Sequence, residues 1–135
     1  PDGSLEVTVP SQRPVLRQET ALQMRELLQA VVDQGTGHRA AVPGYAVGGK
    51  TGTTEKFLYE EGHYSENDRI ASFIGIAPIN DPEIVIAVVL DSPYGEREED
   101  GVTVELKFGG VSAAPVFARV AETALQALGV TPDGQ

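Results

Sequence analysis

Two apolar runs joined by a short connection constrain the fold of this chain most strongly. Residues 70–77 (Ile-Ala-Ser-Phe-Ile-Gly-Ile-Ala) and 84–90 (Ile-Val-Ile-Ala-Val-Val-Leu) are rich in branched side chains, which favours strands. The connection Pro78-Ile79-Asn80-Asp81-Pro82 suits an antiparallel hairpin and is too short for the crossover that parallel strands need. Because the first run is apolar on both faces and the second is unbroken, we expect both strands to be interior and covered on two faces.

The rest of the chain predicts helices packed on this hairpin. Apolar residues recur with helical spacing from about Gln18 to Gln34, and we expect their stripe to belong to the core; its members are Met24, Leu27, Leu28 and Val31. A final helix is expected at about 110–128, and we expect Gly109 and Gly110 to let it approach the sheet closely. The other segments are expected as strands at 5–9 and 45–54 and as polar loops at 55–68 and 92–108. The order predicts an α+β fold, an antiparallel sheet flanked by helices.

Charge and residue usage exclude several classes of function. The formal net charge of -10 argues against nucleic acid as a partner, because its phosphates would be repelled. No apolar run approaches the roughly 18 to 20 residues that span a bilayer. The chain has no cysteine, and His38 and His63 have no partner at metal-ligand spacing, so we expect neither a metal nor a cofactor.

The segment Gly48-Gly49-Lys50-Thr51-Gly52-Thr53 carries the most functional information, and it admits two hypotheses. The first is a phosphate loop, because residues 44–51 satisfy that pattern letter for letter. A phosphate loop must follow a buried strand and open a helix. Here Pro43 and Gly44 precede the segment, and Gly52, Thr53 and Thr54, which are poor helix formers, follow it. The context therefore disfavours a nucleotide site.

The second hypothesis is an edge strand that lines an acyl-transfer cleft. Lys50 would supply a positive field for a carboxylate, and the hydroxyls of Thr51 and Thr53 would hydrogen-bond to it. Gly52 would leave room for a substrate lying antiparallel to the strand. The backbone amide of Thr53 would form half of an oxyanion hole, a contribution on the order of 3 kcal/mol to transition-state stabilisation.

Flanking motifs make the second hypothesis specific. In chain order they are Gln18-Glu19-Thr20-Ala21, Gly35-Thr36-Gly37, Val42-Pro43-Gly44-Tyr45, Gly49-Lys50-Thr51-Gly52-Thr53, Phe73-Ile74-Gly75-Ile76-Ala77-Pro78 and Gly109-Gly110-Val111-Ser112-Ala113-Ala114-Pro115-Val116-Phe117. Together they closely resemble the C-terminal part of the transpeptidase domain of class B penicillin-binding proteins, where Lys-Thr-Gly is the third catalytic motif. The resemblance runs from the first residues to about Leu128.

The resemblance implies a peptidoglycan D,D-transpeptidase that crosslinks stem peptides through an acyl-serine intermediate and binds β-lactam antibiotics. It assigns Lys50 and Thr53 as catalytic residues and Thr51, Gly52 and Thr53 as substrate-binding residues. It further implies a parent protein anchored in the bacterial cell membrane, with this domain on the extracytoplasmic side. Proteins of the cell-division or elongation complexes are the implied partners.

One departure from the family is large. None of the serines, at positions 4, 11, 65, 72, 92 and 112, is followed by a lysine three residues on, so the nucleophilic Ser-x-x-Lys motif is absent. Ser65-Glu66-Asn67 matches the second motif, Ser-x-Asn, but follows Lys-Thr-Gly instead of preceding it. We therefore expect residues 1–135 to form the C-terminal part of one transpeptidase domain, to be inactive alone and to need the N-terminal half as a partner. A related serine β-lactamase, a β-lactam sensor and a non-catalytic partner module are the alternatives.

Overall fold

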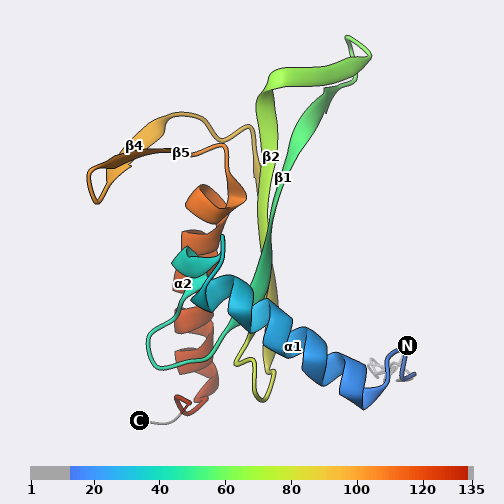
Figure 1. Cartoon of the computed structure of the whole chain (residues 1–135), viewed down its shortest axis with the longest axis vertical. Helices are drawn as coiled ribbons and strands as arrows, with labels where there is room; N and C mark the ends of the chain where they lie inside the picture. Colours follow the sequence, from blue (N-terminus) through green and yellow to red (C-terminus); the bar gives the residue numbers. More distant parts are fainter. Residues whose placement is uncertain (1–12, 134–135) are drawn as a thin grey trace, which may run out of the picture.

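The computed structural model describes residues 13–133. Its elements are α1 (Gln18–Asp33), the 3-10 helix η1 (His38–Ala40), β1 (Gly48–Leu58), β2 (His63–Ala77), β3 (Ile84–Asp91), β4 (Glu96–Glu99), β5 (Val102–Glu105) and α2 (Gly109–Leu128). The strand expected at 5–9 lies outside the described residues. The expected α+β plan is confirmed, because an antiparallel sheet packs with two α-helices (Figure 1).

The main sheet has the order β1-β2-β3, with both neighbouring pairs antiparallel. Helix α2 covers one face of it (Figure 1). The rings of Phe73 on β2 and Phe117 on α2 are both fully buried, and their centroids lie 4.9 Å apart. This aromatic contact is the centre of the core. Ala113, Ala114 and Ala121 belong to the same core, and their small side chains allow α2 to pack closely against the sheet.

The opposite face of the sheet is largely open. Lys50, Ile74 and Ala87 are paired across the three strands, so their side chains share this face. On β3 the alternate residues Val85 and Val89 are 68% and 62% exposed. The prediction that both strands are interior and covered on two faces is therefore wrong within residues 13–133. Helix α2 packs on one face only, Ile74 on β2 is 52% exposed, and β3 forms an edge of the sheet.

The apolar stripe of α1 was likewise predicted to be core, and this is wrong for most of its length. Met24 and Leu27 are 47% and 62% exposed, and within the helix only Val32 is buried. The helix crosses one end of the sheet, where the backbone of Leu28 and Gln29 lies against Gly48. The beginning of α1 extends away from the sheet (Figure 1), which leaves Met24 and Leu27 exposed.

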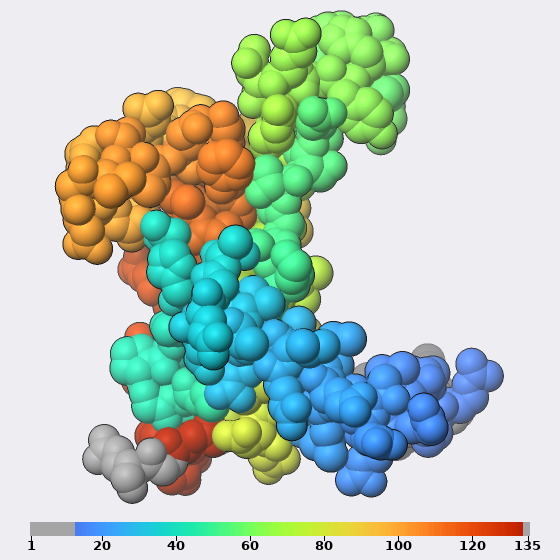
Figure 2. Space-filling model, in the orientation of Figure 1, coloured from blue at the N-terminus to red at the C-terminus, as the bar shows by residue number. Residues whose placement is uncertain are grey.

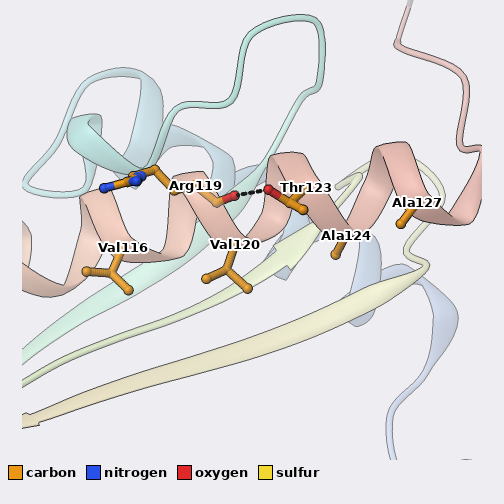
Figure 3. A pocket seen from close by; sticks show the side chains of 6 residues that line it. All are labelled: Val116, Arg119, Val120, Thr123, Ala124 and Ala127. Carbon is orange, nitrogen blue, oxygen red and sulfur yellow. Dashed lines mark hydrogen bonds between the residues drawn. The ribbon is translucent and has the colours of Figure 1, made fainter.

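Helix α2 also carries an open apolar side. Val116, Val120, Ala124 and Ala127 lie along it (Figure 3), and with Arg119 and Thr123 they line a hollow of about 540 Å³. Val116 and Val120 are 39% and 47% exposed. The helix thus buries Phe117, Ala121 and Leu125 on one side and leaves a second apolar side uncovered.

Both segments expected as polar loops contain strands instead. Residues 55–68 complete β1 and begin β2, forming a long hairpin, and residues 96–105 form a second hairpin, β4–β5. Figure 2 shows the two hairpins as separate projections from the body. Most side chains of both hairpins are polar and exposed, so the alternation that reveals a half-buried strand is missing. Between residues 13 and 133 no helix is both long and apolar enough to cross a membrane.

Candidate functional site

The segment from Lys50 to Thr53 lies in the extended strand β1, as the cleft hypothesis predicts. The strand continues to Leu58 without turning into a helix, so the phosphate-loop hypothesis is wrong. Within the described part of the chain β1 pairs only with β2 and forms the edge of the sheet. Half of the backbone donors and acceptors of an edge strand face away from its neighbour and are free to bind an extended peptide.

Successive side chains of β1 point to opposite faces of the sheet. Lys50 and Gly52 share the open face, whereas Thr51 and Thr53 share the face that α2 covers. The Lys50 ammonium reaches across the edge, donating a hydrogen bond to the Thr51 carbonyl oxygen (2.9 Å) and lying 3.4 Å from the Thr51 hydroxyl. One short stretch of the edge therefore combines a cation with two hydroxyl groups.

A hollow of about 330 Å³ opens beside the two threonines. It lies between β1, the turn that contains η1, and the beginning of α2. Its lining residues are Thr36, His38, Arg39, Thr51, Thr53, Phe108, Gly110 and Val111. The hollow brings Thr51 and Thr53 together, while Lys50 stands at its edge through its contact with Thr51.

Both threonine hydroxyls are held in place by hydrogen bonds. The Thr53 hydroxyl accepts a bond from the backbone N–H of Gly109 (3.1 Å). Because an amide occupies one lone pair, the hydroxyl proton of Thr53 remains available to an acceptor in the hollow. The Thr51 hydroxyl lies 3.0 Å from the hydroxyl of Thr36, and either group can be the donor. This arrangement suits an anionic oxygen, which accepts hydrogen bonds and is attracted to the ammonium.

Glycines at the start of α2 permit this arrangement. A Cβ at Gly109 would lie 2.3 Å from the Ser72 carbonyl oxygen and 2.4 Å from that of Gly52. A Cβ at Gly110 would lie 2.3 Å from the carbonyl oxygen of Thr36. The prediction that these glycines let the final helix approach the sheet closely is confirmed. Without that approach the Gly109 amide would not reach Thr53.

An ion pair joins the hollow to the β4–β5 hairpin. The Arg39 guanidinium donates to both carboxylate oxygens of Glu99, through Nε at 3.0 and 2.8 Å and through Nη2 in a further contact. Hydrogen bonding to Arg39 holds the pKa of Glu99 below its ordinary value, and the same bond raises the pKa of Arg39. Glu99 was expected in a polar loop; the structure instead places it in β4, where it pairs with Arg39.

The structure separates Ser65-Glu66-Asn67 from the hollow. Ser65 lies on β2 near the hairpin tip, nine positions before Ile74, the residue paired with Lys50. Its hydroxyl donates to the Asp68 carboxylate (3.0 Å) and accepts from the amides of Asn67 and Asp68, so it is engaged in local hydrogen bonds within β2. Among residues 13–133 no cluster of three or more His, Cys, Asp or Glu side chains could hold a metal ion.

Sequence reasoning missed several residues that line the hollow. Thr36 belongs to the Gly-Thr-Gly motif noted as a family flank, which was the signal that could have placed it there. Phe108 precedes the Gly109-Gly110 pair and could have been found in the same way. Arg39 gave no signal, because its partner Glu99 is 60 residues away in the sequence.

Comparison with known proteins is consistent with this geometry. The family described as the penicillin-binding protein transpeptidase domain matches residues 5–122. Stage V sporulation protein D of Bacillus subtilis is 43% identical over 122 residues, which cover 90% of this chain and 17% of that protein. The probable peptidoglycan D,D-transpeptidase PenA of Neisseria meningitidis serogroup A is 36% identical over 128 residues, covering 94% of this chain and 20% of that protein.

Solved structures give the same result. Penicillin-binding protein 3 of Mycobacterium tuberculosis in complex with ampicillin superimposes with a TM-score of 0.79 at 36% identity, over 100% of this chain and 30% of that chain. The transpeptidase domain of Burkholderia pseudomallei penicillin-binding protein 3 gives a TM-score of 0.75 at 36% identity, over 98% of this chain and 37% of that chain. The chain thus spans about a fifth of the two curated relatives and about a third of these structures.

Proposed function

This chain belongs to the penicillin-binding protein transpeptidase domain family, as a C-terminal part of a class B member, and we propose that it supplies one wall of a serine acylation site. The proposed reaction joins peptidoglycan stem peptides through an acyl-serine intermediate, and β-lactams acylate the same serine. The observation that carries this proposal is the extended edge strand, which presents Lys50, Thr51 and Thr53 beside a hollow.

Each residue of the strand has a distinct proposed role. The Lys50 ammonium attracts the substrate carboxylate and favours proton movement at the neighbouring serine. The hydroxyls of Thr51 and Thr53 donate hydrogen bonds to that carboxylate. Gly52 leaves the edge open to an extended peptide, and the backbone N–H of Thr53 contributes to the oxyanion hole. These roles require no cofactor.

The nucleophile in this proposal comes from an N-terminal half of the same domain. No Ser-x-x-Lys motif occurs in the 135 residues, and the open apolar surfaces support a missing partner. Val85 and Val89 on β3, and Val120 on α2, are 68%, 62% and 47% exposed. Apolar patches of this kind are rare on isolated domains and are typical of interfaces. We place the N-terminal half on these surfaces and the domain outside the cytoplasmic membrane, where peptidoglycan is built.

Labelling with a fluorescent penicillin tests the proposal. The intact protein that contains this chain should be labelled covalently, and mass spectrometry should locate the adduct on a serine outside residues 1–135. This chain alone should remain unlabelled, and mixing it with the folded N-terminal half should restore labelling. A folded, intact protein that takes no label would refute the proposal. Rapid release of the acyl group would instead identify a β-lactam hydrolase.

A further inference from the structure

The end of the β1–β2 hairpin carries an exposed aromatic cluster that the proposed reaction does not use. Phe57 and Tyr64 face each other across the two strands, with ring centroids 5.1 Å apart at an interplanar angle of 74°. Tyr59, in the turn, lies 5.1 Å from Phe57 at 79°. Figure 2 shows this end of the hairpin standing clear of the body. We call residues 57–66 the aromatic tip.

The fold itself does not account for the whole cluster. A cross-strand aromatic pair stabilises a hairpin, which explains the contact between Phe57 and Tyr64. Tyr59, however, is 89% exposed, and Tyr64 is 59% exposed. The buried aromatic contact of the core, between Phe73 and Phe117, is elsewhere. Exposed tyrosines grouped on a projecting, otherwise polar element are typical of protein interfaces.

The charge around the cluster is negative. Glu60, Glu61 and Glu66 are exposed, and no lysine or arginine lies between positions 57 and 66. The flanking bases are engaged by other acids, with Lys56 2.7 Å from Asp91 and Arg69 3.9 Å from Glu55. Glu61 contacts His63 (3.0 Å), whereas Glu60 and Glu66 form no ion pair within residues 13–133. Aromatic faces bordered by free carboxylates attract cations by two mechanisms, cation–π and Coulombic attraction.

We propose that the aromatic tip is a docking surface for a basic segment of another protein, rich in arginine or lysine. Arginine suits it best, because a planar guanidinium stacks on an aromatic ring while donating to a carboxylate. The net charge of -10 would steer such a segment toward the chain and would repel nucleic acid and anionic lipid. A neutral saccharide would gain binding energy from stacking on the rings but not from the carboxylates. An experiment that removes the charge of the ligand therefore distinguishes a saccharide from a basic segment.

The test uses the intact protein and a synthetic nine-residue peptide with alternating arginine and glycine. Its control is the same peptide with citrulline, a neutral isostere, in place of arginine. The arginine peptide should bind, and Tyr59→Ala should weaken binding about tenfold, as expected for a lost cation–π contact. Glu60→Gln with Glu61→Gln should also weaken binding several-fold and reduce its dependence on salt.

The β4–β5 hairpin offers a charge-matched control without an aromatic cluster. Glu96 and Glu98 are exposed there, and Glu96→Gln with Glu98→Gln should change peptide affinity by less than about twofold. Equal weakening by both glutamine pairs would overturn the proposal, because binding would then follow net charge alone. Equal binding of the citrulline peptide, or competition by a neutral chitin oligosaccharide, would also overturn it. Penicillin labelling of the same variants should be unchanged, so this test is independent of the proposed reaction.

Discussion

The backbone amide of Gly109, the first residue of α2, donates a hydrogen bond of 3.1 Å to the hydroxyl of Thr53 on β1. This bond ties the end of the covering helix to the edge strand at the hollow. It fixes the hydroxyl so that its own proton is directed to another acceptor. The positions of the helix and of the proposed carboxylate-binding group are therefore linked by a single contact.

Replacing the Thr53 hydroxyl should slow acylation. Thr53→Val keeps the shape of the side chain but removes the donor to the ligand carboxylate. A hydrogen bond to a charged group is worth about 1.5–3 kcal/mol, so the second-order rate constant for acylation of the intact protein by penicillin should fall about 10- to 100-fold. Thr53→Ser, which retains the hydroxyl, is the control and should stay within a few-fold of the parent. Equal losses in both variants would argue that the hydroxyl has no role.

Removing the Lys50 ammonium should also slow acylation. Lys50→Ala removes the positive charge at the edge of the hollow, and we expect acylation to slow by about 100-fold or more because the carboxylate and the developing negative charge lose a partner. Lys50→Arg restores charge but not the compact ammonium, so partial recovery is expected. Lys56→Ala, which removes a lysine of the same strand that pairs with Asp91, is the matched control. An unchanged rate in Lys50→Ala would contradict the assignment.

A methyl group at Gly109 should destabilise the protein. Its Cβ would meet the carbonyl oxygens of Ser72 and Gly52 at 2.3 and 2.4 Å, and neither backbone can move without disturbing the sheet. We expect Gly109→Ala to lower the free energy of unfolding by about 1–3 kcal/mol in urea titrations, the usual effect of overpacking. Thr123→Ala, at an exposed position of the same helix, should change it by less than about 0.5 kcal/mol. If Gly109→Ala left the free energy of unfolding unchanged, α2 would have to lie farther from β1 than the structure places it.

The Arg39–Glu99 pair should make the free energy of unfolding depend on pH in the acidic range. Arg39 lowers the pKa of Glu99 from its usual 4.5 in the folded state, so the folded protein binds this proton less readily than the unfolded chain. The resulting stabilisation is present above about pH 4.5 and is lost as pH falls through the lowered, folded-state pKa. Glu99→Gln should therefore reduce the fall in unfolding free energy between pH 6 and pH 3. Glu96→Gln is the control; an identical acid profile for Glu99→Gln and the parent would contradict the prediction.

Local patterns were sufficient to predict the positions of the two α-helices, of β3 and of the part of β2 from residue 70 onward, but not what covers them. Short stretches of sequence carry the signals: helical spacing in α1, branched residues in β3, and residues without a side chain at 109 and 110. The strand around Lys50 was placed correctly because helix-forming residues do not follow it. It begins at Gly48 instead of Tyr45, and it runs four residues beyond Thr54.

Other features could not be predicted because their causes are not local. The outer parts of β1 and β2 project from the body (Figure 2), and their apolar residues do not alternate with polar ones, so no period-two pattern marks them as strands. The exposure of Val85 and Leu27 depends on what covers them and not on their own sequence pattern. The contact of Arg39 with Glu99 joins residues 60 positions apart, and it positions a hairpin that composition alone presented as a solvated loop.

A crystal structure of the intact protein acylated by a penicillin tests the central claim most directly, because the ligand carries both the reacting carbonyl and a carboxylate. We predict that the carboxylate oxygens lie about 2.7–3.2 Å from the hydroxyl of Thr51 or Thr53, with the ligand extended along the free edge of β1. A ligand bound covalently to serine whose carboxylate lies away from both threonines and from Lys50 would contradict the account.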